Sequence, residues 1–162
     1  MPVIDITKDT DQHKITITAE FAAPPERVWQ VYADPRQLEK VWGPPGYPAT
    51  VVLHEFVPGG RMHYFMTSPE GEKFPGYWQF SAVDAPSSFE FSDGFADMDF
   101  RQDENLPESQ NHYAFTAAEG GTRAVYTSVY PSAEALQQVV DMGVEEGTRQ
   151  AFNQIDDLLA AD

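Results

Sequence analysis

MGVEEGTRQAFNQIDDLL, residues 142–159, is the stretch of sequence that organises the rest of this chain. It continues an apolar pattern that begins after Ser132, a residue suited to capping the start of a helix. Small or apolar residues then recur every three or four positions, at Leu136, Val140, Gly143, Gly147, Ala151, Ile155 and Leu158. This spacing is that of one face of an α-helix, so we predict one long C-terminal helix.

Two glycines lie in the middle of this apolar face. Inside a helix, Gly143 and Gly147 each cost about 1 kcal/mol relative to alanine. Their position indicates either close packing of the helix on another element or space left open beside it. Both interpretations stay open at this point.

The chain before residue 132 has the pattern of antiparallel strands. KITITAEF, residues 14–21, alternates strictly between apolar and polar side chains, as a strand with one buried face does. Six further strands are predicted between Gly- and Pro-rich turns, at residues 50–57, 61–67, 74–83, 88–92, 111–117 and 122–130. We therefore expect a sheet of about seven strands.

Two short helices are predicted between the first strand and the second. The segments are APPERVWQVYADP, residues 23–35, and RQLEKVW, residues 36–42, with prolines where a helix can begin or must end. After them the loop WGPPGYP, residues 42–48, places two large aromatic residues among prolines and glycines. The overall class is α+β, in one domain spanning residues 1–162.

The composition excludes several classes of function. The chain has 26 acidic and 10 basic residues, and its net charge of −16 repels nucleic acid and anionic lipid. It has no run of about 20 apolar residues that could cross a membrane, and its first residues lack the pattern of a signal peptide. We therefore expect a cytoplasmic location. The absence of cysteine excludes disulfides, thiolate metal sites and cysteine nucleophiles.

From Ile15 to Leu159 the chain resembles the family of homologues of the activator of the heat-shock protein 90 ATPase, within the START/Bet v 1-like superfamily. The segments that carry this resemblance are FAAPPERVWQVYADPRQLEKVWGP, PGG, DGFAD and MGVEEGTRQAFNQIDDLL. Its most telling residues are Trp42-Gly43-Pro44 and the pair Gly143 and Gly147.

The resemblance implies a helix-grip fold, in which a curved antiparallel sheet wraps around the long C-terminal helix and encloses a cavity. It also implies that the 42–48 loop forms part of the cavity rim, with Trp42 and Tyr47 as apolar surface; the alternative is that Trp42 only fills the core. The chain departs from the family at Thr148, where many relatives carry tryptophan or another bulky residue. A larger or more polar cavity is expected there.

Two histidines raise the question of chemistry. If Val57 faces Gly60 in the hairpin of residues 50–67, His54 and His63 are cross-strand neighbours on one face, where they can hold a metal or contact a substrate. A register shifted by one residue separates them, and they are then ordinary strand residues. A metal also needs a third ligand that the spacing does not supply.

No other catalytic motif is present. The sequence has no G-x-S-x-G, no H-E-x-x-H and no Gly-rich phosphate loop, so we predict no catalytic residue, metal or cofactor. Asp97, Asp99, Asp103 and Glu104 gather in the long acidic segment 93–108, without the spacing of a calcium loop, and a solvated loop is expected.

Alternating aromatic residues on the strands indicate either a dense aromatic core or an apolar pocket opposite the helix. The predicted ligand-binding residues are Trp42, Tyr47, His54, His63, Phe65, Trp78, Phe80, Phe91, Tyr113, Val140, Gly143 and Gly147. The leading hypothesis is that the chain binds a small hydrophobic or aromatic molecule. The alternative is an interaction module that activates a chaperone ATPase, with a chaperone or a second copy of the chain as partner. A hydrolase or cyclase that uses the histidines is the third.

Overall fold

The computed structural model describes residues 3–161, which form eight strands and four helices. In chain order the elements are β1 (Val3–Asp9), β2 (Lys14–Phe21), α1 (Pro25–Ala33), α2 (Pro35–Trp42), β3 (Ala49–His54), β4 (Arg61–Thr67), β5 (Lys73–Asp84), β6 (Ser88–Phe95), β7 (Ser109–Ala118), β8 (Gly121–Val129), α3 (Ala133–Asp141) and α4 (Val144–Ala160). The predicted domain also includes residues 1, 2 and 162, which lie outside the described residues.

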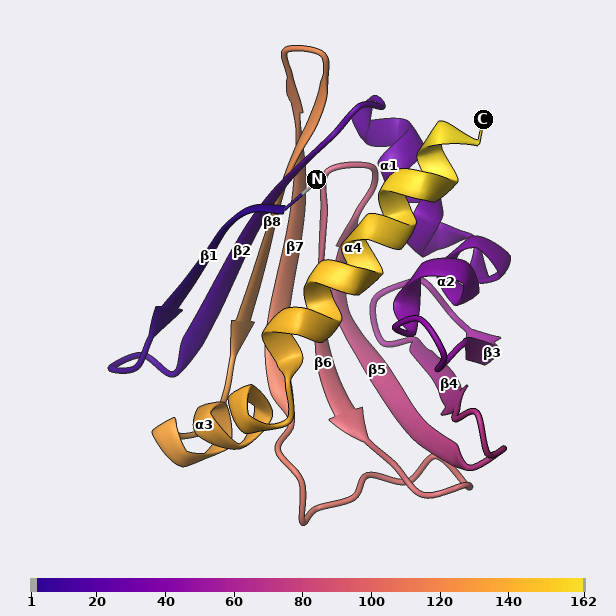
Figure 1. Ribbon diagram of the computed structural model, residues 1–162, viewed down its shortest axis with the longest axis vertical. Coiled ribbons are helices and arrows are strands. Elements are labelled where there is room, and N and C mark those ends of the chain that lie inside the picture. Colours follow the sequence, from indigo (N-terminus) through magenta and orange to yellow (C-terminus); the bar gives the residue numbers. More distant parts are fainter. Residues whose placement is uncertain (1–2, 162) are drawn as a thin grey trace.

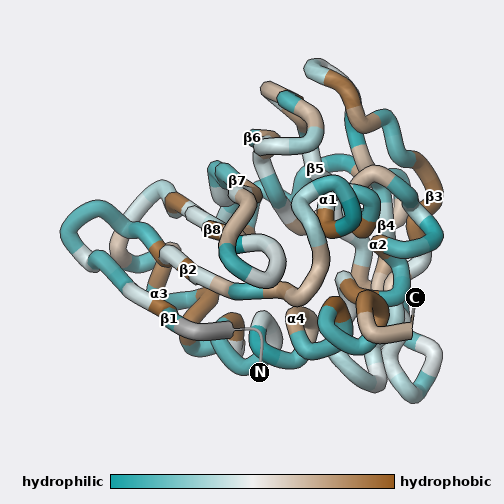
Figure 2. The backbone as a smooth tube through the Cα atoms, turned by 90° about the horizontal axis from the view of Figure 1, so that it is seen from above, coloured by the Kyte–Doolittle hydropathy of each residue, from teal (hydrophilic) through white to brown (hydrophobic). Residues whose placement is uncertain are grey.

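All eight strands belong to one antiparallel sheet, in the order β1-β2-β8-β7-β6-β5-β4-β3. Seen from above, the strands form an arc, and α1, α2 and α4 lie on its inner side (Figure 2). The long helix α4 crosses this concave face diagonally (Figure 1). The predicted α+β helix-grip fold is thereby confirmed.

The strands follow the alternation of the sequence closely. β2 and β4 begin and end at the predicted residues, and both predicted short helices are present as α1 and α2. The sheet has one strand more than expected, because the sequence pattern did not reveal β1. That strand pairs only with β2, at the edge of the sheet, and its alternation of apolar and polar residues covers only residues 4–7 before the charged pair Lys8 and Asp9.

The C-terminal segment differs from the prediction of one unbroken helix. Ser132 does cap its start, since its Oγ accepts a hydrogen bond from the Ala135 amide at 3.0 Å. The helix nevertheless ends at Asp141, and α4 starts in a new direction after Gly143, whose φ of +87° lies in the left-handed region. The apolar spacing continues across this break, and for that reason periodicity alone predicted a single helix.

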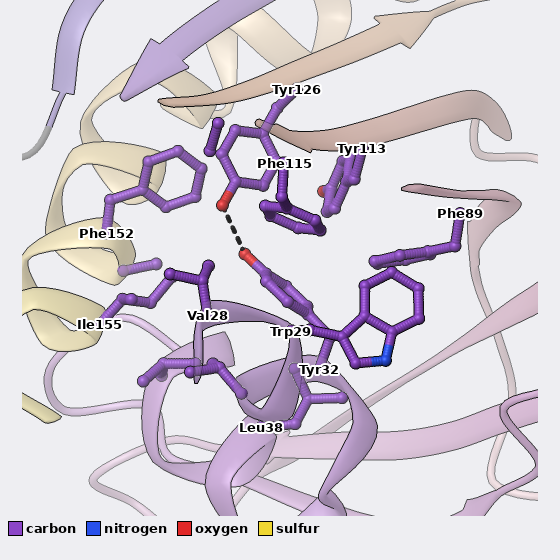
Figure 3. Close-up of a cluster of buried hydrophobic side chains, with 14 of the residues drawn as sticks. Val28, Trp29, Tyr32, Leu38, Phe89, Tyr113, Phe115, Tyr126, Phe152 and Ile155 are labelled. Atoms are coloured by element: carbon purple, nitrogen blue, oxygen red, sulfur yellow. Dashed lines mark hydrogen bonds between the residues drawn. The ribbon is translucent and has the colours of Figure 1, made fainter. Parts of the chain in front are cut away.

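An aromatic core fills the space between the sheet, α1 and the second half of α4 (Figure 3). At its centre the hydroxyl groups of Tyr32 and Tyr126 form a hydrogen bond of 2.9 Å, which joins α1 to β8. Phe152 of α4 packs on Tyr126 with 4.5 Å between ring centroids. Aromatic and aliphatic side chains therefore fill the interior between α1, the sheet and the second half of α4.

Among the described residues, no helix combines the length and the apolar character needed to cross a membrane.

Candidate functional site

A cavity of about 340 Å³ lies between the concave face of the sheet and the first half of α4. Its wall combines residues of β2, β4, β6, β7 and β8 with residues of α3 and α4. Trp42, the last residue of α2, and Pro44 after it complete the wall. Pockets that hold small molecules commonly have volumes of about 300–1,000 Å³. The cavity borders the first half of α4, whereas the aromatic core packs on its second half.

The cavity borders a part of α4 where Gly147 leaves open space. A Cβ atom placed on Gly147 would have no heavy atom of residues 3–161 within 4 Å, although this glycine lies on the cavity wall. Thr148 and Ala151 line the wall beside it, so no bulky side chain of α4 fills the space there. Of the two interpretations of the helix glycines, open space is the one that the structure supports at Gly147.

The two glycines should respond oppositely to substitution by alanine. Gly147→Ala is expected to stabilise the chain by about 0.5–1 kcal/mol, because alanine favours the helix and meets no neighbour. Gly143→Ala is expected to cost about 1–2 kcal/mol, because its φ of +87° is strained for any residue with a Cβ. Equilibrium unfolding in urea measures both changes. A shift of both variants in the same direction would contradict these assignments.

Much of the wall is aromatic. Trp42, Tyr64, Tyr113, Tyr126 and Phe152 all line the cavity. Trp42 is partly buried and also touches the core, with its ring 4.7 Å from that of Trp78 in a T-shaped arrangement. Trp42 therefore both closes the core and contributes to the cavity, which combines the two alternatives that the sequence left open.

A polar group of three residues lies on the β7–β8 side of the wall. The Asn111 amide donates to Ser109 Oγ at 3.0 Å, and Ser128 Oγ donates to Asn111 Oδ1 at 2.6 Å. These polar groups bond to one another, so their demand for hydrogen bonds is largely met within the protein.

Asp93, like the indole N–H of Trp42, is a polar group of the wall without a hydrogen-bond partner among the described residues. It lies on the inner face of β6, opposite Trp78 of β5, and forms part of the cavity wall. Its carboxylate has no hydrogen bond or ion pair to any other described residue. Burial raises the pKa of Asp93 to about 7, and the negative charge of Glu108 contributes to the rise. The side chain is partly accessible, and the cavity borders it.

Glu108, directly before β7, is held in place from the other side of the sheet. The Tyr77 hydroxyl donates a hydrogen bond to its carboxylate, and the Arg61 guanidinium lies over the Tyr77 ring at 4.7 Å. This arrangement fixes a second negative charge near Asp93.

Four of the twelve predicted site residues line the cavity: Trp42, Tyr113, Gly143 and Gly147. Trp78, Phe80 and Phe91 face the same side of the sheet but are buried in the core behind the wall. Val140 packs beside the wall on Ile15 and Leu136.

Two other predicted residues lie away from the cavity. Tyr47 is 39% exposed on the outside of the loop, with its ring 6.3 Å from that of Phe74. Phe65 lies on the outer face of β4, under the Lys73 ammonium group. Proline and glycine turn this loop so that Trp42 faces inward and Tyr47 outward.

The two histidines lie on opposite faces of the sheet. Gly60 does donate to the Val57 carbonyl in the turn, but His54 is paired with Met62 and His63 with Leu53. The strands therefore have the register that separates the two histidines. His54 faces the same way as its partner Met62, and His63, the next residue along β4, faces the opposite way, so the two rings cannot share a metal or a substrate.

Each imidazole has its own surroundings. His54 Nε2 lies 2.7 Å from the Tyr32 carbonyl oxygen, whereas His63 stacks on Phe100 at 4.7 Å. Burial lowers the pKa of both histidines. No histidine among residues 3–161 lines the cavity, so the expectation of cavity histidines is wrong.

Within the part of the chain that the structure describes, no three His, Cys, Asp or Glu side chains gather as a metal site would require. The acidic segment is divided between a strand and a loop, since β6 extends to Phe95. In the loop, Arg101 pairs with Asp97 and Asp99 near the surface.

Sequence reasoning missed Asp93 because it assigned that residue to the acidic loop. A signal was present, however: Phe89, Phe91, Asp93 and Phe95 alternate and therefore share one face of an extended strand. Tyr64, Tyr126 and Asn111 were also missed, although each occupies an inward position of a predicted strand.

Comparisons with known proteins give consistent results. Residues 22–160 match the family described as "Activator of Hsp90 ATPase homolog 1-like protein". The crystal structure of protein Ms6760 from Mycobacterium smegmatis is 63% identical, with a TM-score of 0.92 over 99% of both chains. A solution structure from Arthrobacter aurescens is 42% identical, with a TM-score of 0.94 over 99% of this chain and 93% of the other. No curated protein matches the chain.

Proposed function

Because the chain belongs to the family of activator of Hsp90 ATPase homolog 1-like proteins, whose fold surrounds a cavity here, we propose that it binds a small hydrophobic or aromatic molecule between α4 and the sheet. The family membership confirms the resemblance that the sequence carries. The cytoplasmic location predicted from the sequence remains part of this proposal.

The open space at Gly147 is the observation that carries the proposal. A glycine in the interior of a helix lowers its stability, and here no neighbouring atom takes up the space that it leaves. The wall that faces this space has the aromatic surface and the few polar groups typical of small-molecule sites.

Filling that space should abolish binding. Gly147→Phe is expected to project a ring into the cavity and to lower the affinity for an apolar ligand at least tenfold, while the sheet and the aromatic core stay intact. The ligand would come from a thermal-shift and native mass spectrometry screen of small aromatic compounds. The helix content and melting temperature of the variant show that it folds.

Gly147→Ala is the matched control, because it changes the same helix position but adds only one carbon atom. It should retain the ligands of the wild-type chain. If Gly147→Phe binds the same compounds with the same affinity, or if no compound in the screen binds the wild-type chain, the proposal fails.

The family description also supports a second candidate, activation of a chaperone ATPase through surface contacts. The net charge of −16 would attract a basic surface of such a partner, whether a chaperone or another protein. The turnover rate of the heat-shock protein 90 ATPase from the same cell, measured with and without this chain, tests it; an unchanged rate would remove this candidate.

A further inference from the structure

We propose that the cavity takes a small organic cation, whose positively charged nitrogen lies beside the Asp93 carboxylate while its apolar body contacts the aromatic wall. This inference rests on the proposed function and adds the charge of the ligand to it.

The charges of the wall favour this choice. Among the described residues that line the cavity there are two carboxylates, Asp93 and Glu145, and no lysine, arginine or histidine. Glu145 already pairs with Lys8 at 3.0 Å near the surface. Asp93 has no such partner, and a carboxylate kept from bulk water without a countercharge is costly. A bound cation would supply the missing charge.

The groups that face Asp93 from neighbouring elements are either neutral or negative. Tyr64 of β4, Tyr113 of β7 and Tyr130 after β8 all have pKa values raised above their usual range, chiefly by burial, and stay neutral near pH 7. Glu108 adds a negative charge. Arg61 is occupied on the outer face of the sheet, over Tyr77.

The N-terminus of α4 does not reverse the preference of the cavity for a positively charged ligand. A helix N-terminus carries a partial positive charge, and Gly143 and Val144 place this one at the cavity. However, the first turn of α4 contains Glu145 and Glu146, whose carboxylates offset that partial charge. The aromatic wall also suits a cation, since the faces of tryptophan and tyrosine rings attract positive charge.

The pH dependence of binding follows from the state of Asp93. Since the pKa of Asp93 is raised to about 7, the carboxyl is largely protonated at pH 5.5 and ionised at pH 8.5. A permanent cation binds the ionised form, so its affinity should fall about tenfold for each pH unit below 7. A neutral ligand of the same shape should show no such dependence.

The probes are phenyltrimethylammonium and tert-butylbenzene, which have the same shape and differ in one positive charge. Isothermal titration between pH 5.5 and 8.5 measures both, with benzoate as an anionic comparison. The titrations are made in 0.5 M salt, where a screening length of about 4 Å suppresses attraction of the cation to the acidic surface.

Two variants separate Asp93 from the charge of the whole chain. Asp93→Asn removes the carboxylate in the cavity, whereas Glu90→Gln removes an exposed carboxylate from the outer face of the same strand. In the wild-type chain and in Glu90→Gln, the cation should bind at least tenfold more tightly than tert-butylbenzene at pH 8.5. In Asp93→Asn, the two affinities should lie within about threefold and the pH dependence should disappear.

The possible failures are distinguishable. Binding of tert-butylbenzene as tight as that of the cation at pH 8.5, tighter binding of benzoate, or an unchanged cation preference in Asp93→Asn would each overturn the charge assignment and leave the ligand cavity in place. If none of the three probes binds the wild-type chain, and the screen of aromatic compounds also yields no ligand, the proposed function fails with it.

Discussion

At pH 8, Asp93→Asn is expected to be more stable than the wild-type chain by about 2–4 kcal/mol. In the folded chain, burial raises the pKa of Asp93 from its usual 3.8 to about 7. Each unit of such a shift corresponds to about 1.4 kcal/mol, and water in the adjacent cavity reduces the total. The ionised carboxylate therefore destabilises the folded state above pH 7, and asparagine removes that charge with little change of shape.

The sign of this effect sets its pH dependence. Between about pH 4 and pH 7 the folded chain binds a proton at Asp93 that the unfolded chain has lost, so the contribution of Asp93 to stability falls as the pH rises. The two proteins should thus be about equally stable near pH 4 and diverge up to pH 7. Thermal unfolding at pH 4, 6 and 8 measures this, with an expected difference of roughly 10 °C in melting temperature at pH 8.

Glu90→Gln is again the control, since it removes an exposed charge of the same strand and should follow the wild-type curve. Other carboxyl groups respond to pH in the opposite direction. Hydrogen bonds from Gln37 lower the pKa of Asp34, and backbone hydrogen bonds lower that of Asp97. Their effects are common to all three proteins and cancel in the comparison. Parallel curves for the wild-type chain and Asp93→Asn would mean that the carboxylate is solvated in the folded state.

Trp78→Ala is expected to destabilise the chain by about 3–5 kcal/mol. The Trp78 side chain is fully buried at the point where the aromatic core meets the cavity wall. Its ring stacks on Phe91 at 4.2 Å and meets Trp42 edge-on at 4.7 Å, with Phe89 and Tyr113 also in contact range. Alanine would leave a void that these rings cannot all move to fill. Urea unfolding at pH 6 measures the loss.

Trp78→Phe provides the matched comparison. The indole N–H of Trp78 has no hydrogen-bond partner among the described residues, so phenylalanine loses part of the ring volume but no hydrogen bond. The expected cost is about 1–2 kcal/mol. If Trp78→Ala costs less than Trp78→Phe, or less than about 1 kcal/mol, the assignment of Trp78 to the centre of the packing is incorrect.

Trp78 and Asp93 are cross-strand neighbours, and the boundary between the aromatic core and the cavity lies between them. Around Trp78, aromatic side chains fill the space and stabilise the fold. Beside Asp93 and Gly147, the chain retains an unpaired carboxylate and a helix glycine, and both lower its stability. Local losses of stability of this kind are typical of binding sites, where the protein keeps groups that a ligand will complete.

Local patterns of the sequence predicted most of the secondary structure. The alternation in residues 14–21 and 61–67 defined β2 and β4, and Ser132 marked the start of α3, because these signals depend only on neighbouring residues. The same patterns, together with the order of the segments, were sufficient to recognise the family.

The site depended on contacts between distant segments. Whether Gly147 meets open space, and whether His54 and His63 share a face, depends on how the helix rests on the sheet and on a register shift of one residue. Asp93 stands on an inward strand position that alternation can reveal, but its missing countercharge results from β4, β5, β7 and α4 closing around it. Periodicity describes one segment at a time, whereas burial and charge pairing arise only once separate segments are packed together.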